Sequence, residues 1–162
     1  MKILDKHLLQ KLSAQAKLNP RLRQNHNLHD SYDDPSQRLL NAMEPGSYVR
    51  PHRHLGHPKP EGFVAVRGRL ALLTFDDQGI VEQVVLMGPK ESVFGVDLPC
   101  GVWHTIVSLE EGSAFYETKP GPYQPIQPMD LAPWAPEEGS LGAGDYLEQL
   151  KQIIVAQPDD AS

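Results

Sequence analysis

The sequence predicts a mainly β domain, a sandwich or a barrel, from three observations. Short segments of strand-forming residues recur through the centre of the chain and are separated by turns. Glycine and proline, with 13 and 15 copies, interrupt the chain too often for long helices. Residues 70–75 and 80–86 are apolar runs on either side of Asp76-Asp77-Gln78-Gly79, which is a strong hairpin signal. Several short strands at this spacing favour a sandwich or a barrel.

Length, composition and charge exclude several classes of protein. A chain of 162 residues fits one domain with its own core. With 40% hydrophobic and 22% charged residues, it is neither wholly disordered nor a coiled coil. The net charge of −6 argues against binding to nucleic acid or to an anionic membrane. No apolar run could span a bilayer, and the start lacks the pattern of a secretory signal. Because Cys100 is the single cysteine, no internal disulfide is expected, and the protein is predicted to be cytoplasmic.

The strand pattern continues from residue 37 to residue 119. The expected strands are residues 38–43, 47–54, 61–66, 70–75, 80–86, 92–96, 102–109 and 114–118. A loop at 55–60 contains two prolines, which a central strand would not tolerate. The turn at 97–101 separates the strands expected at 92–96 and 102–109.

The two ends of the chain differ from this centre. Residues 5–18 have apolar side chains at helical spacing, with Asp5 as the cap and Asn19-Pro20 as the stop. The polar residues that follow, up to 36, are expected to be irregular. Six prolines between 120 and 136 predict an extended arm that runs over the surface. A helix over 145–154 and a frayed acidic tail after Gln157 complete the chain. We therefore divide one domain into segments 1–36, 37–119 and 120–162.

Three histidines and a glutamate are the candidate metal ligands. On a strand, His52 and His54 lie on one face, about 7 Å apart along the chain. An antiparallel return of the chain would bring Glu61 beside them, and His104 follows the turn at Pro99-Cys100-Gly101. Imidazole and carboxylate together suit one divalent transition metal, namely iron, manganese, nickel, cobalt, copper or zinc. Calcium and magnesium prefer shells made only of oxygen.

Two alternatives stay open at this site. His57, in the long loop before Glu61, could replace that carboxylate as the fourth ligand, and Glu61 would then orient an imidazole from outside the shell. Either residue is also a candidate base for proton abstraction. A six-coordinate metal with four protein ligands keeps two open positions, which favours a catalytic site over a structural one.

Four further residues are candidates for binding a substrate. Asn25, His26, Arg38 and Asn41 would line the pocket and bind an anionic or hydroxylated ligand. The side chain of Arg38 enters the barrel if Leu39 packs outward, and a buried guanidinium there would need an anionic partner.

The motifs resemble those of the cupin superfamily. The first motif is Gly46-x5-His52-x-His54-x6-Glu61-x6-Gly68, and the second is Pro99-x-Gly101-x2-His104, followed by Ser108 in place of the usual asparagine. This resemblance implies a cupin-type antiparallel β-barrel (a double-stranded β-helix, similar to a jelly roll). It also implies that the three histidines and Glu61 bind a metal inside the barrel.

A more specific resemblance is to the WbuC-type cupin metalloproteins. Its residues are Asn25-His26-Asn27, Gln37 to Asn41, Tyr48 to His54, Lys59-Pro60-Glu61, Gly101 to Thr105 and Lys119 to Tyr123. Members are often encoded among surface-polysaccharide genes, and the resemblance implies a role in sugar metabolism.

These observations lead to two functional hypotheses. The first is a metal-dependent enzyme that acts on a sugar or nucleotide-linked sugar, as an isomerase, an epimerase or an oxygenase. The second is a non-catalytic module that captures a small sugar or acid. Cupins commonly pair, so the resemblance also predicts a possible homodimer, and an exposed sheet edge would be covered in it.

Overall fold

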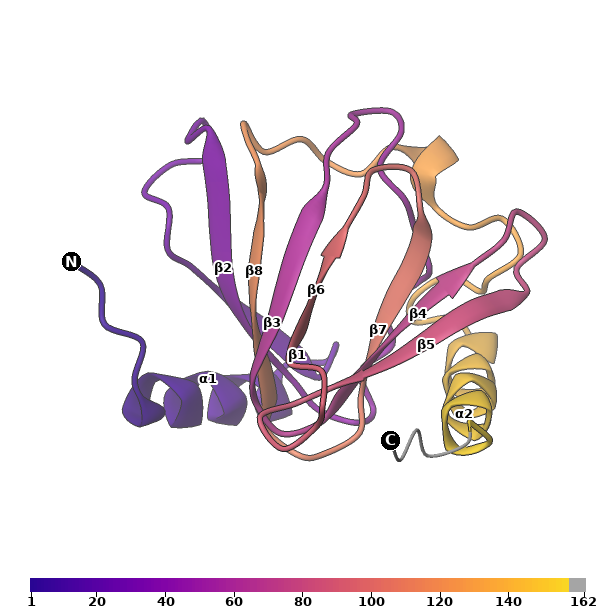
Figure 1. Ribbon diagram of the computed structural model, residues 1–162, viewed down its shortest axis with the longest axis horizontal. Helices are drawn as coiled ribbons and strands as arrows, with labels where there is room; N and C mark the ends of the chain where they lie inside the picture. The colour runs from indigo at the N-terminus through magenta and orange to yellow at the C-terminus, as the bar shows by residue number, and fades with distance from the viewer. Residues whose placement is uncertain (158–162) are drawn as a thin grey trace.

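The computed structural model describes residues 1–157, which form two antiparallel β-sheets and two covering helices (Figure 1). The helical elements are α1 (Lys6–Leu18), the short 3-10 helix η1 (Pro128–Asp130) and α2 (Gly142–Val155). The strands are β1 (Arg23–Asn27), β2 (Ser36–Met43), β3 (Glu61–Arg67), β4 (Leu70–Phe75), β5 (Val81–Met87), β6 (Gly95–Leu98), β7 (Trp103–Ser108) and β8 (Ser113–Pro120).

The order of the strands is that of a jelly-roll barrel. One sheet has the order β1-β2-β8-β3-β6 and the other has the order β5-β4-β7. The two sheets face each other and diverge toward the top of Figure 1, where the loops that lead into β2 and β3 lie. The mainly β, cupin-type barrel expected from the sequence is therefore the observed fold.

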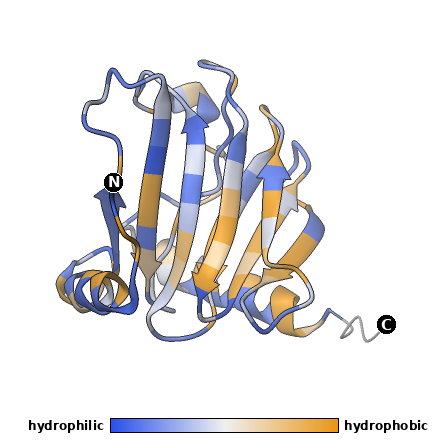
Figure 2. Ribbon diagram, turned by 60° about the vertical axis from the view of Figure 1, so that its left-hand side comes forward, coloured by the Kyte–Doolittle hydropathy of each residue, from blue (hydrophilic) through white to orange (hydrophobic). Residues whose placement is uncertain are grey.

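Alternation along the strands divides the apolar residues into three layers. Between the sheets, residues such as Leu70, Leu72 and Ile106 are buried in one cluster. Their neighbours Leu73 and Val107 point the other way and pack beneath α2. The remaining layer is the outer face of β2, covered by α1, whose side chains form a third cluster with Leu40 and Ala42 of that strand. Figure 2 shows hydrophobic and hydrophilic residues mixed along the strands, whereas most of the loops are hydrophilic.

Most of the expected elements are confirmed, including the N-terminal helix and the hairpin. The side chain of Asp5 caps α1 by accepting the backbone N–H of Leu8 at 2.8 Å. The hairpin pairs β4 with β5, and Gly68 adopts a φ of 72° in the turn before it. The closing helix forms as α2, slightly longer than expected, and the acidic tail lies outside the described residues.

Four expectations about local structure are wrong. The segment 20–36 is not irregular throughout, because β1 pairs with β2 from Arg23↔Met43 to Asn27↔Leu39. The strand expected at 92–96 forms later, as β6, where it pairs with β3. The extended stretch 47–54 joins no ladder and makes isolated bridges only at His52. The aromatic side chain of Tyr116 also predicts a place in the core, but this residue is partly exposed.

The proline-rich arm lies partly inside the fold and not only on its surface. Leu131 bridges to His52, and Asp130 and Ala132 are buried. Within residues 1–157, no helix has the length and apolar character needed to cross a membrane.

Candidate metal centre

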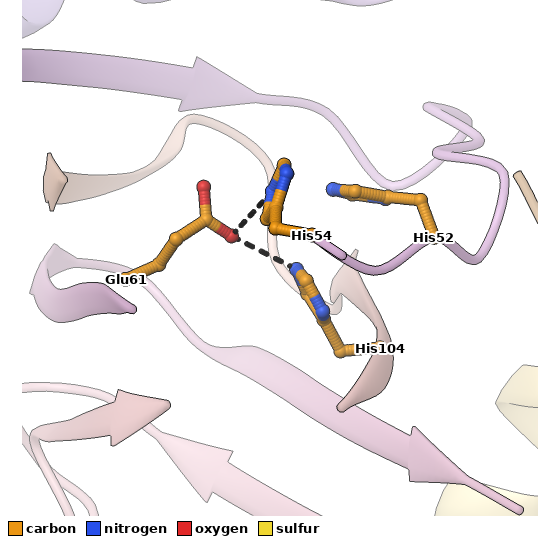
Figure 3. A group of neighbouring side chains, drawn as sticks. All are labelled: His52, His54, Glu61 and His104. Atoms are coloured by element: carbon orange, nitrogen blue, oxygen red, sulfur yellow. Dashed lines mark ion pairs between the residues drawn. The ribbon is translucent and has the colours of Figure 1, made fainter. Parts of the chain in front are cut away.

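Four side chains from three parts of the chain meet at one point inside the barrel. His52 and His54 come from the segment before β3, Glu61 is the first residue of β3, and His104 lies in β7. Each offers a ligand atom, and these atoms all lie within 4.8 Å of one another. Figure 3 shows the rings and the carboxylate directed toward a common centre. The structure thus brings together the four residues selected from the sequence.

Backbone carbonyl groups orient two of the imidazoles. The Nδ1 of His104 lies 2.9 Å from the carbonyl oxygen of Val102, and the Nδ1 of His52 lies 3.1 Å from that of Arg50. A carbonyl oxygen can only accept, so both Nδ1 atoms carry the hydrogen. The Nε2 atoms of these rings therefore keep a lone pair, which is the form that binds a metal.

Glu61 is held from both sides. Its Oε2 lies 3.2 Å from Nε2 of His54 and 3.1 Å from Nε2 of His104. Its Oε1 accepts a hydrogen bond of 2.8 Å from Lys119, which also donates to Glu117. Burial by itself raises the pKa of Glu61, but the polar groups that contact its carboxylate, the Lys119 ammonium among them, hold that pKa well below its usual range. Glu61 is therefore a carboxylate near neutral pH.

The protonation of His52 agrees with a cation site. Burial lowers the pKa of His52 to about 3, and the neighbouring His104 contributes to this effect. The ligand atom of His54 therefore meets three acceptors at the centre, namely Nε2 of His52, Nε2 of His104 and Oε2 of Glu61. Three of these atoms, Nε2 of His54, Oε2 of Glu61 and Nε2 of His104, are buried without a hydrogen-bond partner in the described part of the chain. Converging lone pairs repel each other unless a cation lies between them, so these residues fit a divalent metal.

A cavity of about 500 Å³ lies against this cluster, and its lining tests the predicted substrate residues. Asn25 and Asn41 line it, whereas His26 and Arg38 do not. Leu39 points into the cavity, so Arg38 points out of it and pairs with Asp34 at 3.0 Å. The expectation that Arg38 enters the barrel is therefore wrong, because the alternation of β2 has the opposite phase.

His57 lies apart from the cluster. It is exposed, and its Nε2 lies 3.2 Å from Nε2 of Gln127. Glu61, and not His57, is therefore the fourth member of the group. Trp103 alternates with His104 along β7 and faces away from the site, with its ring beneath the guanidinium of Arg53 at 4.1 Å.

Sequence reasoning did not assign to the cavity several polar residues that line it. Among them are His29, Lys59, Glu117 and Lys119. Alternation along a strand gave a signal for one pair, because Glu117 and Lys119 share a face of β8. His29 and Lys59 lie in loops, where no periodicity indicates a direction.

A buried carboxylate in the arm holds the loop that follows the histidine pair. Asp130 accepts hydrogen bonds from the backbone N–H groups of Leu55 at 3.1 Å and Gly56 at 3.0 Å. Its own carbonyl oxygen accepts from the N–H of Arg53 at 2.9 Å. The arm thereby fixes the backbone on both sides of His54.

Solved structures with a similar fold share little sequence with this chain. A protein of unknown function from Streptococcus pyogenes, SPY1581, has a TM-score of 0.50 at 10% identity, covering 76% of this chain and 90% of that chain. KdgF from Halomonas sp. has a TM-score of 0.49 at 17% identity, covering 66% and 84%. A cupin-2 domain containing protein from Shewanella frigidimarina NCIMB 400 has a TM-score of 0.45 at 19% identity, covering 60% and 80%. At such identities a likeness concerns the fold alone.

A family model matches the sequence, although no curated protein does. Residues 4–87 match the family described as "Domain of unknown function (DUF6016)". The matched span includes three members of the cluster, His52, His54 and Glu61, and ends before His104. Because it covers more than half of the chain, this protein belongs to that family.

Proposed function

We propose that this protein is a metal-dependent enzyme of the cupin fold that acts on a small polar substrate. The observation that carries the proposal is the convergence of three imidazoles and one carboxylate on a single point beside a cavity of about 500 Å³. A six-coordinate metal held by these four residues would keep two positions for a substrate. The volume suits a small ligand, such as a sugar or part of a nucleotide-linked sugar.

The specific assignment proposed from the sequence is a WbuC-type cupin in surface-polysaccharide biosynthesis. Two of the residues that carry this resemblance, Asn25 and Asn41, lie in the cavity wall, and Asn25 is exposed. Amide side chains both donate and accept hydrogen bonds, which suits a ligand with several hydroxyl groups. The candidate reactions are isomerisation or epimerisation, or an oxidation that uses dioxygen.

The residues of this chain would divide the work as follows. His52, His54, Glu61 and His104 would hold the metal, which when bound would polarise a carbonyl or hydroxyl oxygen of the substrate. Lys119 keeps Glu61 ionised and aimed at the centre. Apolar side chains of the barrel, including Met43, Phe63, Ile106 and Phe115, form part of the cavity wall and reduce its access to water.

Metal analysis and a substrate panel test this proposal. We expect the freshly purified protein to contain one transition metal ion per chain. Nucleotide sugars and sugar phosphates would be incubated with the metal-loaded protein, and products followed by mass spectrometry. Chelation should abolish turnover and leave the circular dichroism spectrum of the barrel unchanged. Turnover that survives complete removal of the metal would contradict the proposal.

One observation favours a binding module as the second candidate. Of the two bases considered, His57 lies away from the cavity and Glu61 is already engaged by Lys119, His54 and His104. Neither of these two residues is thus a free base next to the centre. Saturable binding of a panel member without any product, even after long incubation, would support a module that captures a sugar or an acid.

A homodimer and a cytoplasmic location stay predictions. Light scattering at micromolar concentration tests the first, and a monomeric mass would contradict it.

A further inference from the structure

Lys59 has a largely buried side chain that borders the cavity. It is 8% exposed and borders both the main cavity and a second cavity of about 310 Å³. Within residues 1–157 its ammonium group makes no hydrogen bond or ion pair. Lys119, in the same cavity wall, differs in this respect because it binds two carboxylates. Because the ammonium group stays open to the cavity and no carboxylate among the described residues binds it, it is available to an anion that enters from outside the fold.

The carboxylates around Lys59 are each engaged elsewhere. The charged groups that act on it are Lys119, Glu61, Glu117 and Asp130. Glu61 faces the histidines, and Glu117 binds Lys119 and the amide of Asn41. The carboxylate of Asp130 accepts the two N–H groups of the loop at Leu55 and Gly56.

The charge of this group of residues favours an anionic ligand. The two lysines, Lys59 and Lys119, and the three carboxylates of Glu61, Glu117 and Asp130 together carry one net negative charge. A divalent metal at the centre would therefore leave one positive charge in excess. A ligand with one negative charge would neutralise it. A neutral sugar would leave the Lys59 ammonium unpaired.

His29 provides a second, independent observation. It is 6% exposed, lines the same cavity, and its Nε2 is buried without a partner in the described chain. Its Nδ1 lies 3.0 Å from the carbonyl oxygen and 3.1 Å from the backbone nitrogen of Arg38, so these contacts suit either tautomer of the ring. A carboxylate in the cavity would select the tautomer with the hydrogen on Nε2, in which the N–H of Arg38 donates to Nδ1. His29 can therefore donate to an anion in the cavity.

We propose that the cavity binds an organic carboxylate, with Lys59 pairing with the carboxylate group and His29 donating to another oxygen of the same molecule. The proposal rests on the proposed function, and it narrows the substrate to an acid that can also reach the metal, such as a 2-hydroxy or 2-oxo acid or a uronic acid. The lysine contributes affinity for the charge, and the histidine contributes a directional hydrogen bond.

The stability of the free protein gives a test that needs no ligand. In Lys59→Met a side chain of similar length loses its charge, and we expect the midpoint of thermal unfolding to rise by about 2–4 °C. Lys90→Met, at an exposed position, is the matched control and should change nothing. A fall of several degrees in Lys59→Met would assign Lys59 to the structure of the fold and overturn the proposal.

Calorimetry with matched probes tests the binding itself. Lactate, glucuronate and inorganic phosphate are titrated into the protein as purified, together with lactamide and glucose as neutral analogues. We expect at least one carboxylate to bind about 10- to 100-fold more tightly than its neutral analogue. Lys59→Met should remove this preference, and Lys59→Arg should keep most of it. Equal affinities for acids and neutral analogues, or no binding of any anion, would overturn the proposal. Tighter binding of phosphate than of both carboxylates would contradict the proposal and indicate that the ligand carries a phosphate group.

His29→Asn separates the second contact from the structure. The Asn Oδ1 can replace Nδ1 as the acceptor for the N–H of Arg38, while the Nε2–H donor is lost. We expect an unchanged unfolding midpoint and an affinity for the carboxylate that is about tenfold lower. An unchanged affinity would remove His29 from the proposal.

The same titrations are repeated on chelated protein. Anion binding that depends on Lys59 and persists without metal would support this inference even if the metal-dependent enzyme were rejected. Conversely, a protein that holds its metal and turns over a neutral sugar would keep the proposed function and reject the carboxylate.

Discussion

His52 and His104 exchange a reciprocal pair of backbone hydrogen bonds, although they lie far apart in the sequence. The N–H of His52 donates to the carbonyl of His104 at 3.0 Å, and the N–H of His104 donates to the carbonyl of His52 at 2.9 Å. The bridge places their ring centroids 4.4 Å apart. The first and the last of the four candidate metal ligands are thus held together by the backbone, independently of any ion.

The first prediction concerns the histidines. His104→Ala removes one of four candidate ligands, so we expect metal affinity to fall by at least about 100-fold, since even the loss of a neighbouring group costs 10- to 100-fold. His57→Ala should keep full metal content, because His57 lies outside the cluster. Elemental analysis after gel filtration measures both. Equal metal content in the two variants would argue against the centre.

The second prediction separates Glu61 from Glu117. Both carboxylates pair with Lys119, so Glu61→Gln and Glu117→Gln each remove one of its charge partners. Only Glu61 faces the histidines, so only its replacement should weaken metal binding, by tenfold or more. Competition with a chelator of known affinity gives the two constants. If the Glu117 variant loses as much affinity, Glu61 acts through Lys119 and is not a ligand.

The third prediction concerns the arm. Asp130→Asn weakens the hydrogen bonds to the N–H groups of Leu55 and Gly56, and we expect a loss of about 1–3 kcal/mol in the free energy of unfolding. Because the loop follows His54, metal affinity should fall as well. Asp33→Asn, at an exposed position, is the control. Urea unfolding of the metal-free variants measures the first effect, and unchanged stability of the Asp130 variant would refute it.

The fourth prediction concerns pH. Burial alone raises the pKa of Glu138, but its two 2.7 Å contacts with Arg23 help to hold that pKa below the usual 4.5. A lowered pKa means that this pair stabilises the fold above about pH 4.5 and loses its contribution as the pH falls through the folded value.

We therefore expect Glu138→Gln to be less stable than the natural chain at pH 6. The difference in the free energy of unfolding should shrink steadily below pH 4.5. Glu137→Gln is the matched control, since the side chain of Glu137 is 83% exposed and lies 3.8 Å from Arg50. A difference for Glu138→Gln that stays constant from pH 6 to pH 3.5 would show that Arg23 does not act through charge.

Local signals in the sequence predicted much of the fold. The cap at Asp5 and the turn between β4 and β5 depend on neighbouring residues, and both formed as expected. β1 was missed because its residues Arg23–Asn27 are polar, and only the ladder with β2 makes them a strand. The direction of Arg38 was also missed, since alternation gives two faces without saying which one is inside.

The sequence by itself determined which residue types form the centre. A His-x-His pair, a glutamate and a later histidine are polar side chains that can bind a metal, and an apolar core is not built from such residues. It also determined the β class, through turns that act over a few residues. Only the tertiary structure decided that Glu61 and not His57 joins the histidines, that the arm at Asp130 supports the loop, and that Lys59 faces the cavity unpaired. These outcomes depend on contacts between residues far apart in the chain, and no local propensity encodes such contacts.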